Sequence, residues 1–265
     1  MDTYGNYISG SYGLKYYKTI LLKKEDPSSP YTNAVCIEIH EKDYDGANKE
    51  IGDLQNIRVT LQGDRDTIDS PIVKTSLSFT LVDTWDEPDT ENVKHGNWQE
   101  FYTPDSTKFL VRLRLLAKNR QGQTVAQQTV WSGYVTPDSW QESLAYRGSI
   151  TVTARDNIGH LQDFEFDLTP DSDGLVSIRE IITGAMEKVN LPLDFIINAD
   201  TEDYSHGIYN EYEGVNIVDT LVNASLFEEQ DWYSVLEDVL EGLGFVLRFC
   251  WRNDVAVGPD RKSVV

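Results

Sequence analysis

The fold is decided by one stretch in the middle of the chain, Phe109-Leu110-Val111-Arg112-Leu113-Arg114-Leu115-Leu116. Its odd-numbered residues are all apolar, whereas its even-numbered residues include Arg112 and Arg114. Side chains that alternate in this way lie on opposite faces of a β-strand. The same alternation recurs at residues 34–40, 57–61, 76–81 and 149–154. These segments predict antiparallel sheets that fold into a barrel or sandwich, with one face packed and the other polar.

Turn-forming residues separate these segments throughout the first part of the chain, so we expect a β-rich, barrel-like domain over residues 1–168. One segment, residues 83–105, is too long for a hairpin turn and carries seven acidic residues. Its aromatic residues are Trp85, Trp98, Phe101 and Tyr102. Because long ordered loops often have a function and aromatic side chains favour contact, this segment is expected to dock on another surface.

Helical periodicity replaces the alternation after residue 168. Ser177 and Glu180 have the spacing of a capping box, which predicts the start of a helix. A clearer helix begins at Trp232, where apolar residues recur at i, i+3, i+4, i+7, i+8 and i+11. Gly242 and Gly244 are expected to end it.

A further helix is expected between these two, capped by Asn216. Its apolar residues are Ile217, Val218, Leu221 and Val222. We therefore predict a helical α/β insert over residues 169–244 and a returning β segment over residues 245–265. The terminal hairpin lies so near the end of the sequence that it suggests a fragment or a strand supplied by a partner. The predicted fold class is α+β, mainly antiparallel β.

The composition excludes several classes of protein. The chain has 265 residues and a formal net charge of −21, which repels phosphate backbones and argues against specific nucleic-acid binding. No apolar run is long enough for membrane insertion, and the first residues lack the features of a signal peptide. Cys36 and Cys250 lie in strand-like runs and are interpreted as buried thiols rather than a disulfide.

One loop has partial similarity to a calcium-binding loop. Asp171, Asp173, Gly174 and Glu180 match four of its positions, but Thr169 stands where an aspartate is required. The favoured interpretation is a tight turn followed by the capping box, so no metal ligand is predicted.

No catalytic constellation emerges elsewhere. The four histidines have no zinc spacing, and the acidic cluster around His206 is interpreted as a solvated loop. Gly5 and Gly10 have phosphate-loop spacing, but Ser11 and Tyr12 replace the required lysine and hydroxyl residue. We therefore predict no catalytic residue, no cofactor and no enzymatic activity.

Four short motifs occur in a definite order along the chain. They are residues 69–79 before a strand, Trp131-Ser132-Gly133-Tyr134-Val135, Ala154-Arg155-Asp156-Asn157-Ile158-Gly159-His160-Leu161, and Trp232-Tyr233-Ser234-Val235 at a helix start. This order, over roughly residues 55–258, resembles the tail hub or tail-tip proteins of tailed bacteriophages and prophages, especially those of gut Bacteroidetes. From the residues alone, Trp131 and Ala154 are a large and a small core residue, Asp156 starts an Asx-type turn, and Trp232 anchors a helix.

The resemblance implies a structural part of the virion tail, made in the bacterial cytoplasm. Such baseplate-hub-like proteins have barrel-like β domains with an α/β insert. They usually form trimeric rings between the tail tube and the tip or fibre proteins, so the implied partners are sister copies and neighbouring tail-tube, tape-measure or fibre proteins. An acidic bore would let DNA pass without binding it.

Two other classes remain open at this stage. A carbohydrate-binding or adhesin-type β module would use exposed aromatic side chains near Trp85 and Trp98. A hydrolase would use buried acids, but the residues single out no pair for this chemistry.

Overall fold

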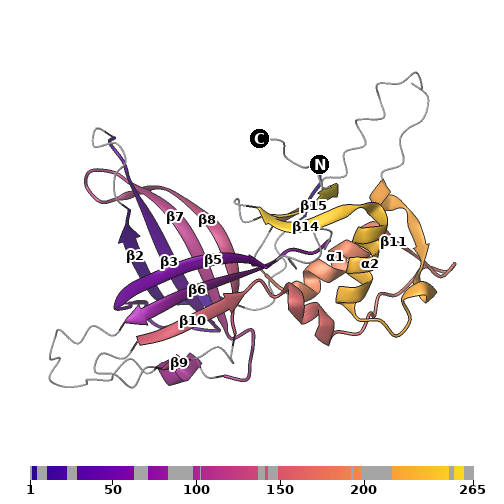
Figure 1. The fold of residues 1–265 in the computed structure, drawn as a ribbon, viewed down its shortest axis with the longest axis horizontal. Helices are drawn as coiled ribbons and strands as arrows, with labels where there is room; N and C mark the ends of the chain where they lie inside the picture. The colour runs from indigo at the N-terminus through magenta and orange to yellow at the C-terminus, as the bar shows by residue number, and fades with distance from the viewer. Residues whose placement is uncertain are drawn as a thin grey trace.

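The structure is a computed structural model that describes residues 2–4, 11–22, 29–62, 71–82, 98–101, 103–136, 141–142, 149–191, 194–197, 217–250 and 254–259. A strand-rich half and a helix-containing half lie side by side (Figure 1). The α+β class, with β-strands predominating, agrees with the prediction.

The strand-rich half is one nine-stranded sheet. Its strands are β2 (Tyr12–Leu21), β3 (Thr32–Lys42), β4 (Lys49–Glu50), β5 (Asp53–Gln62), β6 (Lys74–Val82), β7 (Phe109–Lys118), β8 (Thr124–Val135), β9 (Gln141–Glu142) and β10 (Ser149–Arg155). Their order is β4-β2-β3-β7-β8-β10-β6-β5, with β9 beside β10. All neighbours are antiparallel except β2 and β4.

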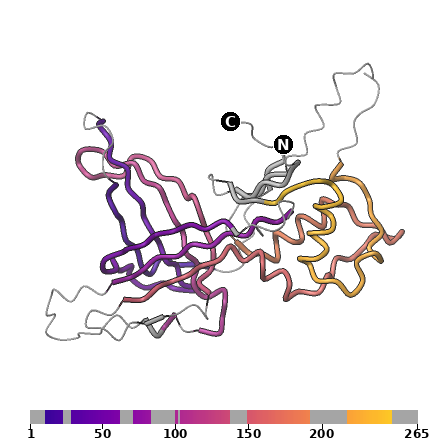
Figure 2. The backbone as a smooth tube through the Cα atoms, viewed as in Figure 1, coloured from indigo at the N-terminus to yellow at the C-terminus, as the bar shows by residue number. Residues whose placement is uncertain are grey.

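The sheet folds over on itself, because β5, β6 and β10 cross the longer strands β2, β3, β7 and β8 (Figure 1). One hydrophobic core fills the space between the two layers, with Ile37 and Ile39 from one layer and Phe79 and Val152 from the other. The faces predicted from the alternation in β3, β6 and β10 are therefore confirmed. In β7 the prediction holds for Phe109, Val111 and Leu113, but Leu115 is 42% exposed and Leu110 is buried on the opposite face. The β2–β3 and β7–β8 hairpins project beyond the crossing strands (Figure 2).

The two ends of the sheet approach each other without closing a barrel. The Ile51 amide donates a 2.9 Å hydrogen bond to the Tyr17 carbonyl on β2, while the residues that follow pair with β6 instead. Within the described residues no ladder joins β5 to β2. The sheet is therefore curled but open.

The apolar face expected for residues 57–61 is only partly packed, which corrects the prediction. A β-bulge interrupts β5, with Asn56 at a φ of 54°. Because β5 is an edge strand and bends here, Val59 is 37% exposed and Leu61 is 65% exposed.

The helix-containing half holds two α-helices and several short elements. The helices are α1 (Ile178–Val189), α2 (Trp232–Leu243) and the 3₁₀ helices η2 (Ile158–Asp163), η4 (Ile217–Asp219) and η5 (Ala224–Phe227). Its strands are β11 (Leu175–Ser177) with β13 (Leu221–Asn223), and the sheet β1 (Asp2–Tyr4), β12 (Asp194–Ile197), β15 (Asp254–Pro259) and β14 (Phe245–Cys250) in that order. One further 3₁₀ helix, η1 (Trp98–Phe101), belongs to the strand-rich half.

Both clear helix predictions are confirmed. Ser177 and Glu180 form the reciprocal capping box at the start of α1. In α2, Asp231 caps the first turn, Gly242 lies within the helix, and Gly244 ends it with a φ of 64°. Trp232 is 1% exposed and packs between the helices, as expected for the anchor of an apolar stripe.

The prediction of a helix after Asn216 is wrong. Residues 217–219 form only one 3₁₀ turn, and β13 follows it in antiparallel pairing with β11. A short apolar run does not distinguish helix from strand, and here the pairing with β11 prevails. Asn216 itself lies outside the described residues.

The last predicted hairpin exists, but its second strand needs no outside partner. β15 lies between β14 and β12, so both of its edges are paired within this chain. β1 pairs with β12, which places the first strand with the helices rather than with the large sheet. The core that contains the helices also includes residues before 168, among them Ile72, Leu110, Tyr134 and Ile158.

No helix in the described part of the chain is both long enough and apolar enough to cross a membrane. The two halves are joined by a backbone bridge between Ile72 and Leu247 and by a shared apolar core that includes Leu110 and Tyr134.

Candidate functional site

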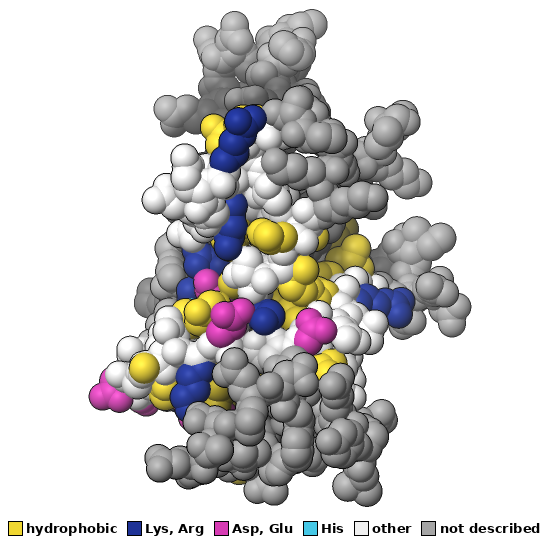
Figure 3. Space-filling model, turned by 90° about the vertical axis from the view of Figure 1, so that its left-hand side faces the viewer, with side chains coloured by type: hydrophobic (Ala, Val, Ile, Leu, Met, Phe, Trp, Pro, Cys, Tyr) yellow, Lys and Arg dark blue, Asp and Glu magenta, His cyan; other side chains and the backbone are white. Residues whose placement is uncertain are grey.

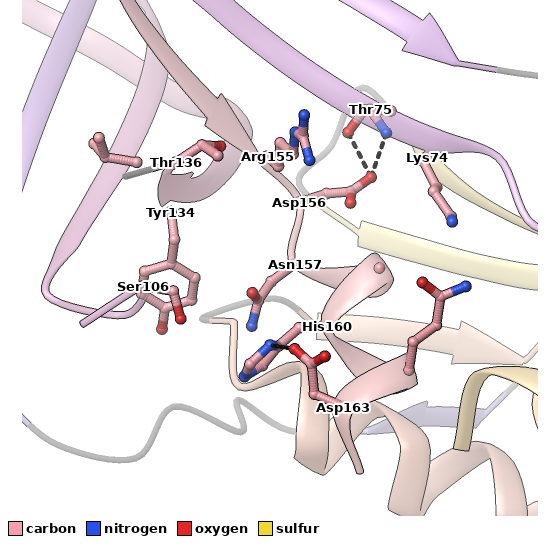
Figure 4. Close-up of a pocket in the computed structure, with 13 residues that line it drawn as sticks. Lys74, Thr75, Ser106, Tyr134, Thr136, Arg155, Asp156, Asn157, His160 and Asp163 are labelled. Atoms are coloured by element: carbon pink, nitrogen blue, oxygen red, sulfur yellow. Dashed lines mark hydrogen bonds and ion pairs between the residues drawn. The ribbon is translucent and has the colours of Figure 1, made fainter. Parts of the chain in front are cut away.

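A cavity of about 390 Å³ lies where the two halves meet. Its walls come from the start of β6, the end of β8, the end of β10 and η2 (Figure 4). The polar residues that line it include Lys74, Ser106, Arg155, Asp156 and His160. As a polar hollow between two units, it is the natural place to look for a binding or catalytic site.

Asp156 is the most perturbed acid of this cavity. It is 2% exposed, and burial raises its pKa to about 6, although hydrogen bonds from Thr75 and Ile158 oppose the rise. Its Oδ2 accepts hydrogen bonds from the Thr75 amide and, at 2.9 Å, from the Thr75 hydroxyl. Its Oδ1 accepts from the Ile158 amide at 3.2 Å, which is the predicted Asx-type turn. Both oxygens therefore hold protein backbone in place. Figure 4 shows the two bonds that Thr75 donates to one of them.

Trp131 extends this network into the core of the sheet. Its indole Nε1 donates a 2.9 Å hydrogen bond to the Thr75 hydroxyl, and its side chain is 2% exposed. Gly133 allows β10 and the Trp131 ring to approach β8 closely. A Cβ atom at this position would lie 2.3 Å from both the Arg155 carbonyl oxygen and the Trp131 ring. The expectation of a large and a small core residue at Trp131 and Ala154 is confirmed.

Two further hydrogen bonds attach the sheet to α1. The Tyr134 hydroxyl donates to the Asn190 carbonyl at 2.5 Å, and the Asn157 amide group donates to the Val189 carbonyl at 2.7 Å. The last carbonyl groups of a helix have no hydrogen-bond donor within the helix, and these two side chains supply one. The junction is therefore held by side chains from β8 and from the turn after β10.

His160 and Asp163 form the one histidine–carboxylate pair that lines the cavity, with 2.6 Å between Nδ1 and Oδ2. A serine, threonine or cysteine nucleophile activated by this pair would have its hydroxyl or thiol bonded to the other ring nitrogen. Ser106 lines the same cavity, but among the described residues no hydroxyl or thiol is hydrogen-bonded to His160. The histidine ring packs edge-on against Phe164 instead.

A second charged cluster lies between β2, β3 and η1. Lys15 lies 2.7 Å from Glu41 and also contacts Glu100, to which the Tyr16 hydroxyl donates. Partial burial lowers the pKa of Lys15, but the hydrogen bonds to Glu100 and Glu41 outweigh it, and the pKa is raised. Phe101, beside Glu100, is fully buried against Phe109 with 4.8 Å between ring centres. The expectation that residues 83–105 dock is confirmed for this end of the segment.

The loop compared with a calcium site forms a turn. Asp171 Oδ1 accepts hydrogen bonds from the Asp173 and Leu175 amides, and Glu180 Oε2 accepts from the Ser177 amide and hydroxyl. The interpretation as a turn and a capping box is confirmed. Within the described ranges, no three His, Cys, Asp or Glu side chains are grouped to hold a metal ion.

Other residues weighed in the sequence lie beyond the described structure. These are Trp85, Tyr102, His95, His206 and the side chains of Trp98 and Cys250. Cys36 is a buried free thiol, as predicted.

Comparison with known proteins adds no assignment. The sequence matches no protein-family model and no curated protein. The function must therefore be argued from the residues and their contacts.

Sequence reasoning had found the turn at Asp156 but not its partner. Thr75 lies 81 positions earlier and belongs to the motif at residues 69–79, which predicts a strand but no partner for Asp156. The contact of Lys15 with Glu100 was also missed, because those residues are 85 positions apart. Nothing in the sequence near these residues specifies either partner.

Proposed function

We propose that this chain is a structural component of a phage or prophage tail, a hub or tail-tip protein that assembles into a ring between the tail tube and the tip or fibres. One observation carries the proposal: the motifs behind the resemblance meet at the junction of the two halves. Trp131, Gly133 and Asp156 fix the sheet side of that junction by hydrogen bonds and close packing. Tyr134 and Asn157, from the same motifs, bond to the end of α1. The motifs therefore specify an architecture rather than a reaction.

The chemistry of the junction supports the same conclusion. Asp156 is the acid with a strongly raised pKa, yet both of its oxygens accept hydrogen bonds from the protein. A general acid or base needs a proton that substrate can reach. A carboxylate occupied in this way acts as a structural tether.

The arrangement of the halves is compatible with a hub. In this proposal the curled nine-stranded sheet is the barrel-like β domain, and α1, α2 and their short strands are the insert. The partners would be sister copies, in a trimer, and tail-tube, tape-measure or fibre proteins. The net charge of −21 per copy favours a ring that DNA passes without binding.

The decisive experiment locates the chain in tailed particles. Particles induced from the organism that encodes it are purified and analysed by mass spectrometry, and an antibody against the chain is used for gold labelling in electron microscopy. We expect the chain in purified particles, with label at the tip end of the tail. Its absence from particles that contain tube and fibre proteins would refute the proposal. Glycan binding that is lost in Trp85→Ala would instead favour the carbohydrate-binding class.

A further inference from the structure

The charge of the chain is distributed unevenly along its sequence. Residues 106–137, which contain β7 and β8, have five basic residues and no acidic one. The basic residues are Lys108, Arg112, Arg114, Lys118 and Arg120. The remaining residues sum to a charge of −26. One hairpin is therefore positive in an otherwise strongly negative protein.

Most of this positive charge lies on the outside of the sheet. Phe109, Val111 and Leu113 of β7 point into the core. Because side chains alternate along a strand, Arg112, Arg114 and Lys118 lie on the opposite face. Arg120 is exposed in the turn between β7 and β8.

Within the described residues, carboxylates pair with only two of these cations, Lys108 with Glu41 at 3.4 Å and Arg114 with Glu38. Glu38 on β3 is shared, because its Oε1 lies 2.8 Å from Arg114 and its Oε2 lies 3.1 Å from His40. Among the described residues, no carboxylate forms an ion pair with Arg112, Lys118 or Arg120. Burial lowers the pKa of Arg112, and the neighbouring Arg114 lowers it further, although Glu38 works the other way. An additional acidic group is therefore favourable here.

Apolar side chains adjoin these cations. Leu21 of β2 and Leu116 of β7 both pair with Ala34, so they lie on the same outer face. Leu21 is 62% exposed, and Val125, just beyond the turn of the hairpin, is 52% exposed. We call Leu21, Arg112, Arg114, Leu116 and Lys118 the basic hairpin face. Figure 3, which views the molecule from the side of the large sheet, shows Lys and Arg side chains from the lower half to near the top, while the Asp and Glu side chains coloured in this view lie in its lower half.

We propose that the basic hairpin face binds an acidic surface on a second copy of this chain. Two copies with a net charge of −21 repel each other unless a basic surface of one meets an acidic surface of the other. The remaining charge of −26 supplies such a surface, and the exposed leucine supplies apolar area to bury. The two surfaces are different, so the contact is heterologous and can generate a ring. This contact would be the interface through which the copies of the proposed hub assemble. The contact can form whether or not the protein is part of a virion.

The test compares two charge-reversal variants of the whole chain. Lys118→Glu/Arg120→Glu alters Lys118 of the basic hairpin face and Arg120 in the adjoining turn. Lys49→Glu/Arg58→Glu makes the same change of net charge at exposed residues of β4 and β5. Sedimentation velocity measures association at protein concentrations up to about 200 µM and in about 50 mM or 500 mM NaCl. We expect the unmodified chain and the β4–β5 variant to associate in low salt, at least about tenfold more weakly in high salt, and the hairpin variant to stay monomeric.

Three outcomes would overturn the inference. They are a monomeric unmodified chain at every concentration in low salt, equal loss of association in both variants, and binding of the hairpin to duplex DNA in place of a second copy. Circular dichroism of both variants separates lost contact from lost fold. The proposed function fails separately: a chain that associates through the hairpin yet is absent from tail particles refutes that function alone. A hairpin variant that assembles normally into particles refutes the interface alone.

Discussion

Replacing Asp156 by asparagine should change how the stability of the protein depends on pH. The carboxylate is buried, and its pKa is raised from the ordinary value of 3.8 to about 6. The folded chain therefore holds a proton more tightly than the unfolded chain, and between these two values its stability falls as the pH rises. The full difference is about 3 kcal/mol, since one pKa unit corresponds to about 1.4 kcal/mol.

Part of this difference can be measured where the protein remains soluble. Moving from about pH 7.5 to about pH 5, which stays above the isoelectric point of 4.4, the carboxyl group should contribute about 1.4 kcal/mol of added stability. Asp156→Asn removes this contribution. The asparagine has only one acceptor oxygen, which Thr75 occupies, so its NH₂ group faces the Ile158 N–H. The loss of the Ile158 hydrogen bond should lower the free energy of unfolding by about 1 kcal/mol at any pH.

Urea unfolding followed by tryptophan fluorescence at both pH values gives the free energies of unfolding. Asp173→Asn is the matched control, because it makes the same chemical change at an exposed residue that joins its turn through its backbone amide, which donates to Asp171. We expect the free energy of unfolding of the unmodified chain and of Asp173→Asn to change with pH in parallel, and that of Asp156→Asn to lack about 1.4 kcal/mol of the gain at low pH. Parallel behaviour of all three proteins would show that Asp156 is not a buried, proton-binding tether.

Four further outcomes follow from the contacts. Gly133→Ala should destabilise the fold by more than about 2 kcal/mol in thermal unfolding, because its methyl group meets a carbonyl oxygen and an indole ring, whereas Gly159→Ala, where nothing lies within 4 Å, should cost less than about 1 kcal/mol. Trp131→Phe keeps an aromatic ring but loses the indole hydrogen bond, and should cost at least about 1 kcal/mol in urea unfolding; an unchanged midpoint would contradict the network. Ser177→Ala removes half of the capping box and should lower the stability by about 1 kcal/mol, seen as a lower melting temperature. Added calcium should leave the melting temperature unchanged, because Asp171 already binds backbone amides, and a rise of several degrees would restore the calcium interpretation.

Local sequence patterns predicted where the helices and strands lie better than they predicted which of them pair with one another. Alternation placed the strands, and the spacing of Ser177 and Glu180 placed the start of α1, because both signals act within a few residues. The bulge at Asn56 was not predicted, although the apolar alternation changes phase there, from Leu54 to Ile57. The pairing of β1 with β12 joins segments nearly two hundred positions apart, and nothing in either segment specifies the other.

The junction illustrates the same limit for a candidate site. The Asx-type turn at Asp156 depends on residues 156–158 alone and was predicted. The bond from Thr75, which gives this aspartate its buried and tethered character, depends on the folded sheet. The basic residues of the β7–β8 hairpin, by contrast, can be counted directly in the sequence. Only the structure shows which of their side chains lie on the outer face.

The position of β15 between β12 and β14 has a consequence for synthesis on the ribosome. Strands β2 to β10 occupy one continuous span, residues 12–155, so the large sheet can form while later residues are still being translated. The pairing of residues 194–197 with β15, by contrast, requires residues 254–257 to have been made. The large sheet can therefore form before the smaller sheet is complete, and a ribosome that pauses before residue 254 leaves β12 and β14 without the strand that joins them.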